Sequence, residues 1–211
     1  MAGKAWKQEK YRRILEEGFR LFSERGIERV TSAEVAEASG VSRATLFRYF
    51  PSKQELVIAI SVWKWENYIE NYQASVHVKK MGEMTGAESL RRFLDSFVEL
   101  YRSHGEILRF NYDFNSYLQY EASSPEQRQP YRNMVDRLGA QFHALYERGM
   151  NDGTLRSDIP EADMFSSAFH IMLAAATRYA MGLVVVYEDA VDPYGELVML
   201  EELLLSRFTN G

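Results

Sequence analysis

The sequence predicts an all-α protein built from a small three-helix head and a larger helical body. Apolar residues recur at spacings of three and four along nearly the whole chain, which is the period of a buried helix face. No segment keeps the alternation of polar and apolar residues that a half-buried strand shows. Residues that start or break helices are dense up to about residue 55 and sparse beyond it, so short helices come first and long ones follow.

Local signals mark the ends of the helices in the head. Thr31 and Glu34 have the spacing of a capping box, in which two side chains satisfy free N–H groups at a helix start. Ser42 can cap the next helix, and Pro51 ends it because the residue before a proline avoids helical geometry. The helices predicted in this way span residues 6–25, 32–39 and 43–49, and a long fourth helix follows Ser52.

The body is predicted to consist of longer helices with fewer signals between them. The segment Val184–Tyr187 is rich in β-branched residues, but it continues the helical period of the residues before it and is therefore assigned to a helix. The predicted helices of the body span residues 87–103, 105–121, 126–150, 161–188 and 193–208.

The composition limits the class of protein. The 211 residues include no cysteine, which excludes a disulfide scaffold, a thiolate metal site and a thiol nucleophile. The net charge is −5, yet residues 1–55 hold 11 Lys and Arg against 8 Asp and Glu, so a basic head precedes an acidic body. This pattern is expected where only the head meets an anionic partner. Without a secretory signal or an apolar run of spanning length, we expect a cytoplasmic protein with no membrane partner.

The sequence shows no motif of an enzyme active site. The glycine-rich phosphate-binding, nucleophile-elbow and zinc-protease patterns are all absent. The four histidines, His77, His104, His143 and His170, lie far apart in the sequence and lack the spacing of metal ligands. We therefore expect a protein that is not an enzyme and that needs neither a metal ion nor a cofactor.

Residues 35–50 have the layout of a helix-turn-helix, with two short helices joined by a tight turn at Gly40. The apolar positions predict a small core made of Val35, Ala36, Val41, Leu46 and Phe50, closed by Phe19 and Phe22. The opposite face of the third helix could lie in the major groove of DNA, about 12 Å wide, and it carries Arg43, Ala44, Phe47 and Arg48. The alternative is a hairpin with a solvated face, in a helical interaction or adaptor protein without DNA binding.

The string TSAEVAEASGVSRATLFRYFPSKQEL, at residues 31–56, closely resembles the signature of the TetR family of bacterial transcriptional regulators, and the resemblance covers residues 10–56. The body is similar to family members only in length and layout. The resemblance implies a three-helix helix-turn-helix head on a helical body, acting as a ligand-responsive repressor that binds a palindromic operator as a homodimer. It also implies a DNA-binding domain over residues 1–52 and an effector-binding and dimerisation domain over 53–211.

Carried over position by position, the resemblance implies that Arg43 reaches a base edge and that Tyr49 and Lys53 hold the phosphate backbone. Position 47 is usually tyrosine in the family. Phe47 lacks the hydroxyl that would bind a phosphate, whereas its ring can still contact a thymine methyl group. Arg48 stands at a variable position and is either a phosphate contact or a solvated charge. The implied DNA-binding residues are Thr31, Ser32, Ser42, Arg43, Ala44, Thr45, Phe47, Arg48, Tyr49 and Lys53.

The resemblance further implies two roles for the body. The last two helices pair with their copies in a four-helix bundle, through Met172, Ala176, Ala180, Leu183, Leu197, Leu200, Leu204 and Phe208. The aromatic residues of the body would be read as ordinary core from their spacing alone, but the resemblance implies a pocket for an apolar or aromatic small-molecule effector. The implied lining is Phe97, Tyr101, Phe142, Tyr146 and Phe169, with Arg178 as an orienting polar group.

Overall fold

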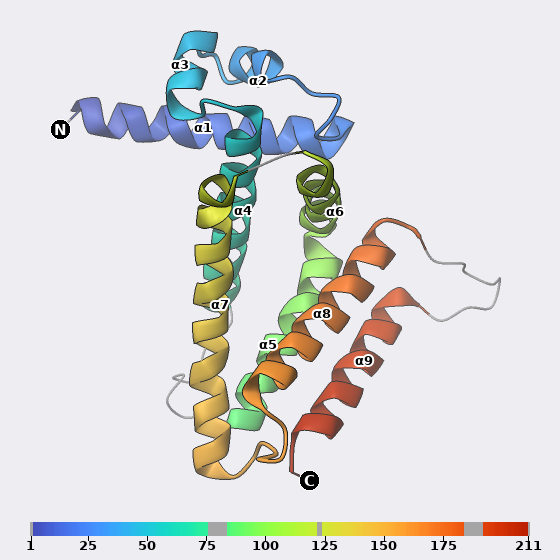
Figure 1. The fold of residues 1–211 in the computed structure, drawn as a ribbon. Coiled ribbons are helices and arrows are strands. Elements are labelled where there is room, and N and C mark those ends of the chain that lie inside the picture. Colours follow the sequence, from blue (N-terminus) through green and yellow to red (C-terminus); the bar gives the residue numbers. More distant parts are fainter. Residues whose placement is uncertain (1, 76–83, 122–123, 184–191, 211) are drawn as a thin grey trace. The chain divides into compact units, whose positions relative to one another are not determined.

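A computed structural model describes residues 2–75, 84–121, 124–183 and 192–210 (Figure 1). Within these residues the chain forms nine α-helices and one isolated β-bridge, between Leu155 and Thr209. None of the described helices combines the length and hydropathy that a membrane crossing requires. The helices are α1 (Ala2–Arg25), α2 (Ser32–Ala38), α3 (Arg43–Tyr49), α4 (Lys53–Ser75), α5 (Gly86–Ser103), α6 (Gly105–Tyr120), α7 (Pro125–Asp152), α8 (Glu161–Ala180) and α9 (Pro193–Phe208).

The predicted all-α fold is confirmed, and α3 and α9 begin and end at the predicted residues. The prediction of one helix over residues 161–188 is wrong at its C-terminal end, because α8 stops at Ala180. Gly182 has a φ of +66°, a left-handed conformation that ends an α-helix and that glycine adopts at little cost. The segment Val184–Tyr187, predicted to be helical, lies outside the described residues.

The chain divides into two compact units. Unit 1 comprises Met1–Ile69 and Arg109–Met134, and unit 2 comprises Glu70–Leu108 and Val135–Gly211. The helices α4, α6 and α7 therefore contribute residues to both units. The domain boundary expected after residue 52 divides a DNA-binding part of the chain from an effector-binding part, whereas the two compact units are defined by packing. That domain boundary stays a prediction.

In unit 1, apolar residues of α1, α2 and α3 form the core of the head. Six of the seven residues predicted for this core are buried, and burial of each large side chain contributes about 1.5–3 kcal/mol. Val41 is the exception: it is only half-buried, because it lies in the turn before α3 rather than on a helix face. The core extends to α6, since the ring centroids of Phe19 and Phe110 lie 5.3 Å apart.

In unit 2, α5, α8 and α9 pack against one another. The start of α5 also touches α7 backbone to backbone. A Cβ atom on Gly86 would lie 2.1 Å from the Cα of Gly149, so this contact requires a glycine. The N–H of Gly86 donates to a carboxylate oxygen of Asp152 at 2.8 Å and joins the two helices.

Candidate nucleic-acid interface

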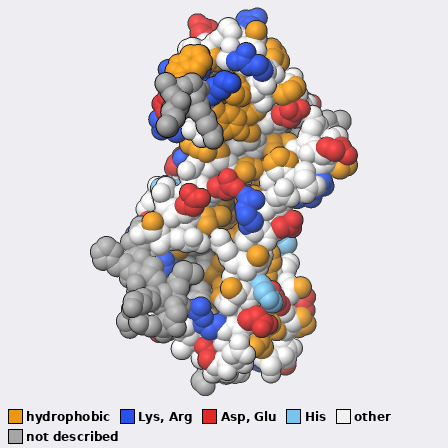
Figure 2. Space-filling view, turned by 90° about the vertical axis from the view of Figure 1, so that its left-hand side faces the viewer, with side chains coloured by type: hydrophobic (Ala, Val, Ile, Leu, Met, Phe, Trp, Pro, Cys, Tyr) orange, Lys and Arg blue, Asp and Glu red, His pale blue; other side chains and the backbone are white. Residues whose placement is uncertain are grey.

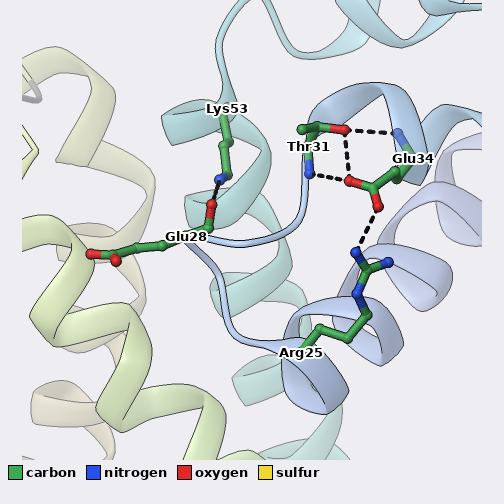
Figure 3. A network of polar contacts seen from close by, with 5 residues as sticks. All are labelled: Arg25, Glu28, Thr31, Glu34 and Lys53. Atoms are coloured by element: carbon green, nitrogen blue, oxygen red, sulfur yellow. Dashed lines mark hydrogen bonds and ion pairs between the residues drawn. The ribbon is translucent and has the colours of Figure 1, made fainter.

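A capping box fixes the start of α2 (Figure 3). The hydroxyl of Thr31 accepts a hydrogen bond from the N–H of Glu34 at 3.3 Å, and Oε2 of Glu34 accepts one from the N–H of Thr31 at 2.8 Å. The second carboxylate oxygen, Oε1, lies 2.7 Å from Nη2 of Arg25 at the end of α1. These donors, the backbone N–H of Thr31 foremost, lower the pKa of Glu34 to about 2. The charged carboxylate therefore ties the end of α1 to the start of α2.

A hydrogen-bonded turn sets the angle between α2 and α3. Gly40 has a φ of +63°, and its N–H donates to the carbonyl of Glu37 at 2.9 Å. The N–H of Val41 donates to the carbonyl of Ala36 at 3.0 Å. Ser39 is buried, and both its N–H and its hydroxyl donate to the carbonyl of Val35. The N–H groups of residues 39–41 are all bonded, which holds the turn in one conformation.

The helix α3 buries one face and exposes the other. Ser42 caps it, since its hydroxyl accepts a hydrogen bond from the N–H of Thr45 at 3.2 Å. Leu46 is buried, and Phe50 closes the core just beyond the helix. The exposed face carries the four residues predicted to lie there, Arg43, Ala44, Phe47 and Arg48. In the described part of the chain no ion pair engages either arginine, so both guanidinium groups are available to a ligand.

The other predicted contact residues of the head have neighbours that already orient them. The hydroxyls of Ser42 and Thr45 lie 2.9 Å apart. The ring of Tyr49 is half-buried and packs edge-on against Tyr11 of α1, with centroids 5.7 Å apart. Thr31 is exposed, but its hydroxyl hydrogen is directed to Glu34. Ser32 is half-buried at the first position of α2.

Lys53, at the first position of α4, is half-buried and bonds within the protein (Figure 3). Its Nζ donates a hydrogen bond to the backbone carbonyl of Glu28 at 3.3 Å and lies 5.6 Å from the ring centroid of Tyr117. Partial burial lowers the pKa of the Lys53 ammonium, while the carboxylates of Glu121 and Glu28 act in the opposite direction. The head thus brings together predicted contact residues at the starts of α2 and α4 and along α3.

Three of the predicted effector residues lie in one cluster of aromatic rings in unit 2. Phe97 and Phe169 contact each other with centroids 5.8 Å apart. Phe142 contacts Phe93 at 5.2 Å and Phe165 at 5.1 Å. The sequence interpretation omitted Phe93 and Phe165 from this group. The pairs 93/97 and 165/169 are each four residues apart on one helix, and this spacing is the signal that could have identified them.

The remaining predicted effector residues make other contacts in unit 2. The ring of Tyr101 faces that of Tyr179 at 6.1 Å, and the hydroxyl of Tyr146 donates to the carbonyl of Ile159 at 3.3 Å. Arg178 is exposed. No group of three or more His, Asp or Glu side chains within the described ranges could hold a metal ion.

The predicted dimer stripe divides into core and surface residues. Five of its members are buried within the single chain, where α5, α8 and α9 pack together, and we reassign them to the core: Met172, Ala176, Leu197, Leu204 and Phe208. Ala180 and Leu200 are half-buried, and Leu183 is exposed. The exposed large apolar residues of these two helices are Ile171, Tyr194, Met199 and Leu203, none of which was assigned to the dimer from the sequence.

Sequence comparison identifies the head. Residues 14–60 match the model of the family described as bacterial regulatory proteins, tetR family. The nucleoid occlusion factor SlmA of Actinobacillus pleuropneumoniae serotype 5b is 34% identical over 89 residues, which are 42% of this chain and 42% of the relative. SlmA of Haemophilus influenzae strain PittGG is 55% identical over 40 residues, 19% of this chain and 18% of the relative. The chain thus spans less than half the length of these curated relatives.

Solved structures match nearly the whole chain. A TetR transcription regulator from Haloarcula marismortui has a TM-score of 0.73 at 17% identity, covering 96% of this chain and 100% of its own. A regulator from Saccharomonospora viridis in complex with choline has a TM-score of 0.72 at 18% identity, covering 95% and 97%. FadR from Bacillus subtilis in complex with stearoyl-CoA has a TM-score of 0.69 at 19% identity, covering 93% and 98%. The head of this chain thus matches the tetR family model over residues 14–60, and its fold is that of the solved TetR-family structures.

Proposed function

We propose that this chain is a ligand-responsive transcriptional repressor that binds a palindromic DNA operator as a homodimer. The observation that carries the proposal is the exposed face of α3, where Arg43 and Arg48 flank Ala44 and Phe47. Buried Leu46 and the Ser42 cap hold this helix in one orientation. A rigid helix with a cationic outer face fits the major groove of DNA. We also propose a cytoplasmic location, because the proposed DNA partner lies there.

Each exposed residue has a role in this proposal. The planar guanidinium of Arg43 donates two hydrogen bonds to O6 and N7 of a guanine. The small side chains of Ala44 and Thr45 allow the helix to approach the bases, and Phe47 packs on a thymine methyl group. Backbone phosphates are held by residues at both ends of the motif: Thr31, Ser32, Ser42, Arg48, Tyr49 and Lys53.

The dimer is proposed to form through the exposed apolar residues of α8 and α9. Leu203 is 59% exposed and Met199 is 54% exposed, on a helix whose opposite face is buried. A two-fold axis through this surface would make the same patch meet itself, as in a four-helix bundle. Two copies of α3 about one DNA turn (~34 Å) or more apart would read the two halves of a palindrome.

The effector is proposed to be an apolar or aromatic small molecule that binds at the ring cluster of unit 2. Edge-to-face contacts among Phe93, Phe97 and Phe142 provide apolar surface with defined geometry. Tyr101 and Tyr146 supply hydroxyl groups in the same unit. The similar FadR and Saccharomonospora viridis structures contain stearoyl-CoA and choline, respectively, and both compounds serve as first probes.

Effector binding is proposed to weaken operator binding by a population shift. Such a ligand binds more tightly to dimer conformations in which the spacing of the two heads does not fit the operator. The affinity for DNA must then fall by the difference between the ligand's binding free energies to the two kinds of conformation, typically about 1–3 kcal/mol. We assign the coupling to α4. It begins at Lys53, beside the predicted DNA contacts, and contributes residues to both compact units.

The test is an electrophoretic mobility shift with promoter fragments from both sides of the protein's own gene, and with a random-sequence library as a second source of operators. We expect retardation of a specific fragment that a shuffled duplex does not compete away. Thermal-shift screening with stearoyl-CoA, choline and small aromatic compounds then finds ligands, and each hit is added to the operator titration. Absence of any sequence-specific binding would favour the helical adaptor protein instead.

A further inference from the structure

The first half of α1 lies before the segment that matches the family model and is strongly basic. The helix begins at Ala2, whereas the family match begins at residue 14. Residues 1–13 contain a single acidic residue, Glu9, and five basic ones: Lys4, Lys7, Lys10, Arg12 and Arg13. Such a surplus of positive charge on one short helical segment favours an anionic partner.

The basic residues of this segment differ in how far they are already neutralised. Arg12 lies 2.9 Å from Glu9 and 2.6 Å from Glu16, so its charge is largely satisfied within the helix. No ion pair among the described residues engages Lys7, Lys10 or Arg13. These three cations can therefore bind a ligand.

The geometry places one of these cations, Arg13, beside the helix-turn-helix and Lys10 on the same face of α1. Residues 6, 10 and 13 are four and three positions apart and share one face of α1. Trp6 is 58% exposed, and Nζ of Lys10 lies 3.5 Å from its ring centroid, a contact that restrains the lysine. The guanidinium of Arg13 lies against the turn between α2 and α3. A Cβ atom placed on Gly40 in this turn would be 3.4 Å from Nη2 of Arg13. Figure 2, which looks onto the N-terminal end of α1, shows Lys and Arg side chains beside hydrophobic ones on the upper part of this face.

We propose that Lys7, Lys10 and Arg13 bind phosphates of the DNA that flanks the half-site read by α3. This inference rests on the proposed function, because it extends the DNA footprint of the same head. The contacts would be made to the backbone and would therefore be independent of the base sequence. Each phosphate neutralised releases counterions, so the contacts would add to the salt dependence of binding.

The experiment uses the full chain and an operator selected from a random-sequence library. The operator is prepared as two duplexes: a short one that ends where the palindrome ends, and a long one with six further base pairs on each side. The variant Lys7→Ala/Lys10→Ala/Arg13→Ala is compared with the charge-retaining Lys7→Arg/Lys10→Arg/Arg13→Lys. Alanine suits an exposed helix, so both variants should fold, and thermal unfolding checks this. Affinity is measured by fluorescence anisotropy between about 50 and 200 mM salt, the range over which such contacts are screened.

The wild type is expected to bind the long duplex more tightly than the short one, whereas the alanine variant binds both equally. The slope of log affinity against log salt on the long duplex should fall by about 0.9 for each phosphate that the variant no longer binds. The charge-retaining variant should behave as the wild type does. Equal losses by the alanine variant on both duplexes, or an unchanged salt slope, would overturn the inference while the proposed function stands. Failure of the wild type to bind any duplex would instead refute the proposed function.

Discussion

The ammonium of Lys53 donates a hydrogen bond to the backbone carbonyl of Glu28, with Nζ 3.3 Å from the oxygen. This bond fastens the start of α4 to the segment between α1 and α2. The family position that is proposed to hold a DNA phosphate is therefore also part of the structure of the head. Substitutions at this residue should change both stability and DNA binding, and the two effects can be separated.

For Lys53→Ala we expect weaker binding to all DNA sequences alike and a salt slope smaller by about one unit per subunit, because a phosphate contact carries no base information. We also expect a lower melting temperature, since the bond to Glu28 is removed. Lys53→Arg keeps the charge and should retain most of the salt slope. Anisotropy titrations on specific and shuffled duplexes, together with thermal unfolding, measure both effects. A selective loss on the operator alone would show that Lys53 reads sequence instead.

The capping box should make the stability of the head depend on pH. The pKa of Glu34 is lowered to about 2 in the folded chain, first by the backbone N–H of Thr31. A carboxyl group with a depressed folded pKa adds stability that is present above its unfolded pKa, about 4.3, and lost as the pH falls towards the folded value. Lowering the pH from 6 to 3 should therefore reduce the melting temperature of the wild type more than that of Glu34→Gln. Thermal unfolding at each pH measures this difference. Parallel curves for the two proteins would show that the carboxylate does not contribute.

The contact between α5 and α7 predicts opposite effects for two glycine-to-alanine substitutions. In Gly86→Ala the new Cβ would lie 2.1 Å from the Cα of Gly149, so the backbone must move. We expect a loss of about 1–3 kcal/mol, as for other overpacked sites. A Cβ on Gly139, inside α7, would meet no atom within 4 Å, so Gly139→Ala should stabilise the helix by up to about 1 kcal/mol. Chemical denaturation measures both changes, and a stabilising Gly86→Ala would contradict the close approach.

The proposed dimer surface predicts a monomer when a charge is placed on α9. Leu203→Glu should leave the fold intact, because the side chain is exposed in the single chain, but should prevent association of the apolar patch. Tyr120→Glu, at an exposed residue of α6, is the matched control and should remain dimeric. Sedimentation velocity at micromolar concentration distinguishes the 24.5 kDa chain from its dimer. A dimeric Leu203→Glu protein would place the interface elsewhere.

The parts of the structure that depend on neighbouring residues in the chain could be predicted from the sequence. Thr31 and Ser42 cap their helices because the groups that they bond lie three residues away. The end of α8 was missed because apolar periodicity continues past Gly182, whereas the backbone conformation of that single residue stops the helix.

The parts that depend on distant residues could not be predicted in the same way. Periodicity showed that α8 and α9 have apolar faces, but not which face is covered by α5. Met172 and Leu197 were therefore assigned to the dimer although the chain buries them itself, while exposed Leu203 was passed over. In the same way, the sequence alone did not indicate that Arg13 meets the turn at Gly40, 27 residues further along the chain.

The proposed function requires α3 to read a specific DNA sequence through Arg43, and a comparison of two duplexes tests this requirement. The selected operator and a shuffled duplex of the same composition are titrated with the wild type, Arg43→Ala and Arg43→Lys at constant salt. Loss of a bidentate base contact costs about 1–3 kcal/mol, so Arg43→Ala should bind the operator at least about fivefold more weakly and the shuffled duplex almost as well as the wild type. Arg43→Lys keeps the positive charge but lacks the planar guanidinium that donates two hydrogen bonds to one base, so it should also lose specificity. Equal losses on both duplexes, or none on either, would show that Arg43 does not read the base sequence.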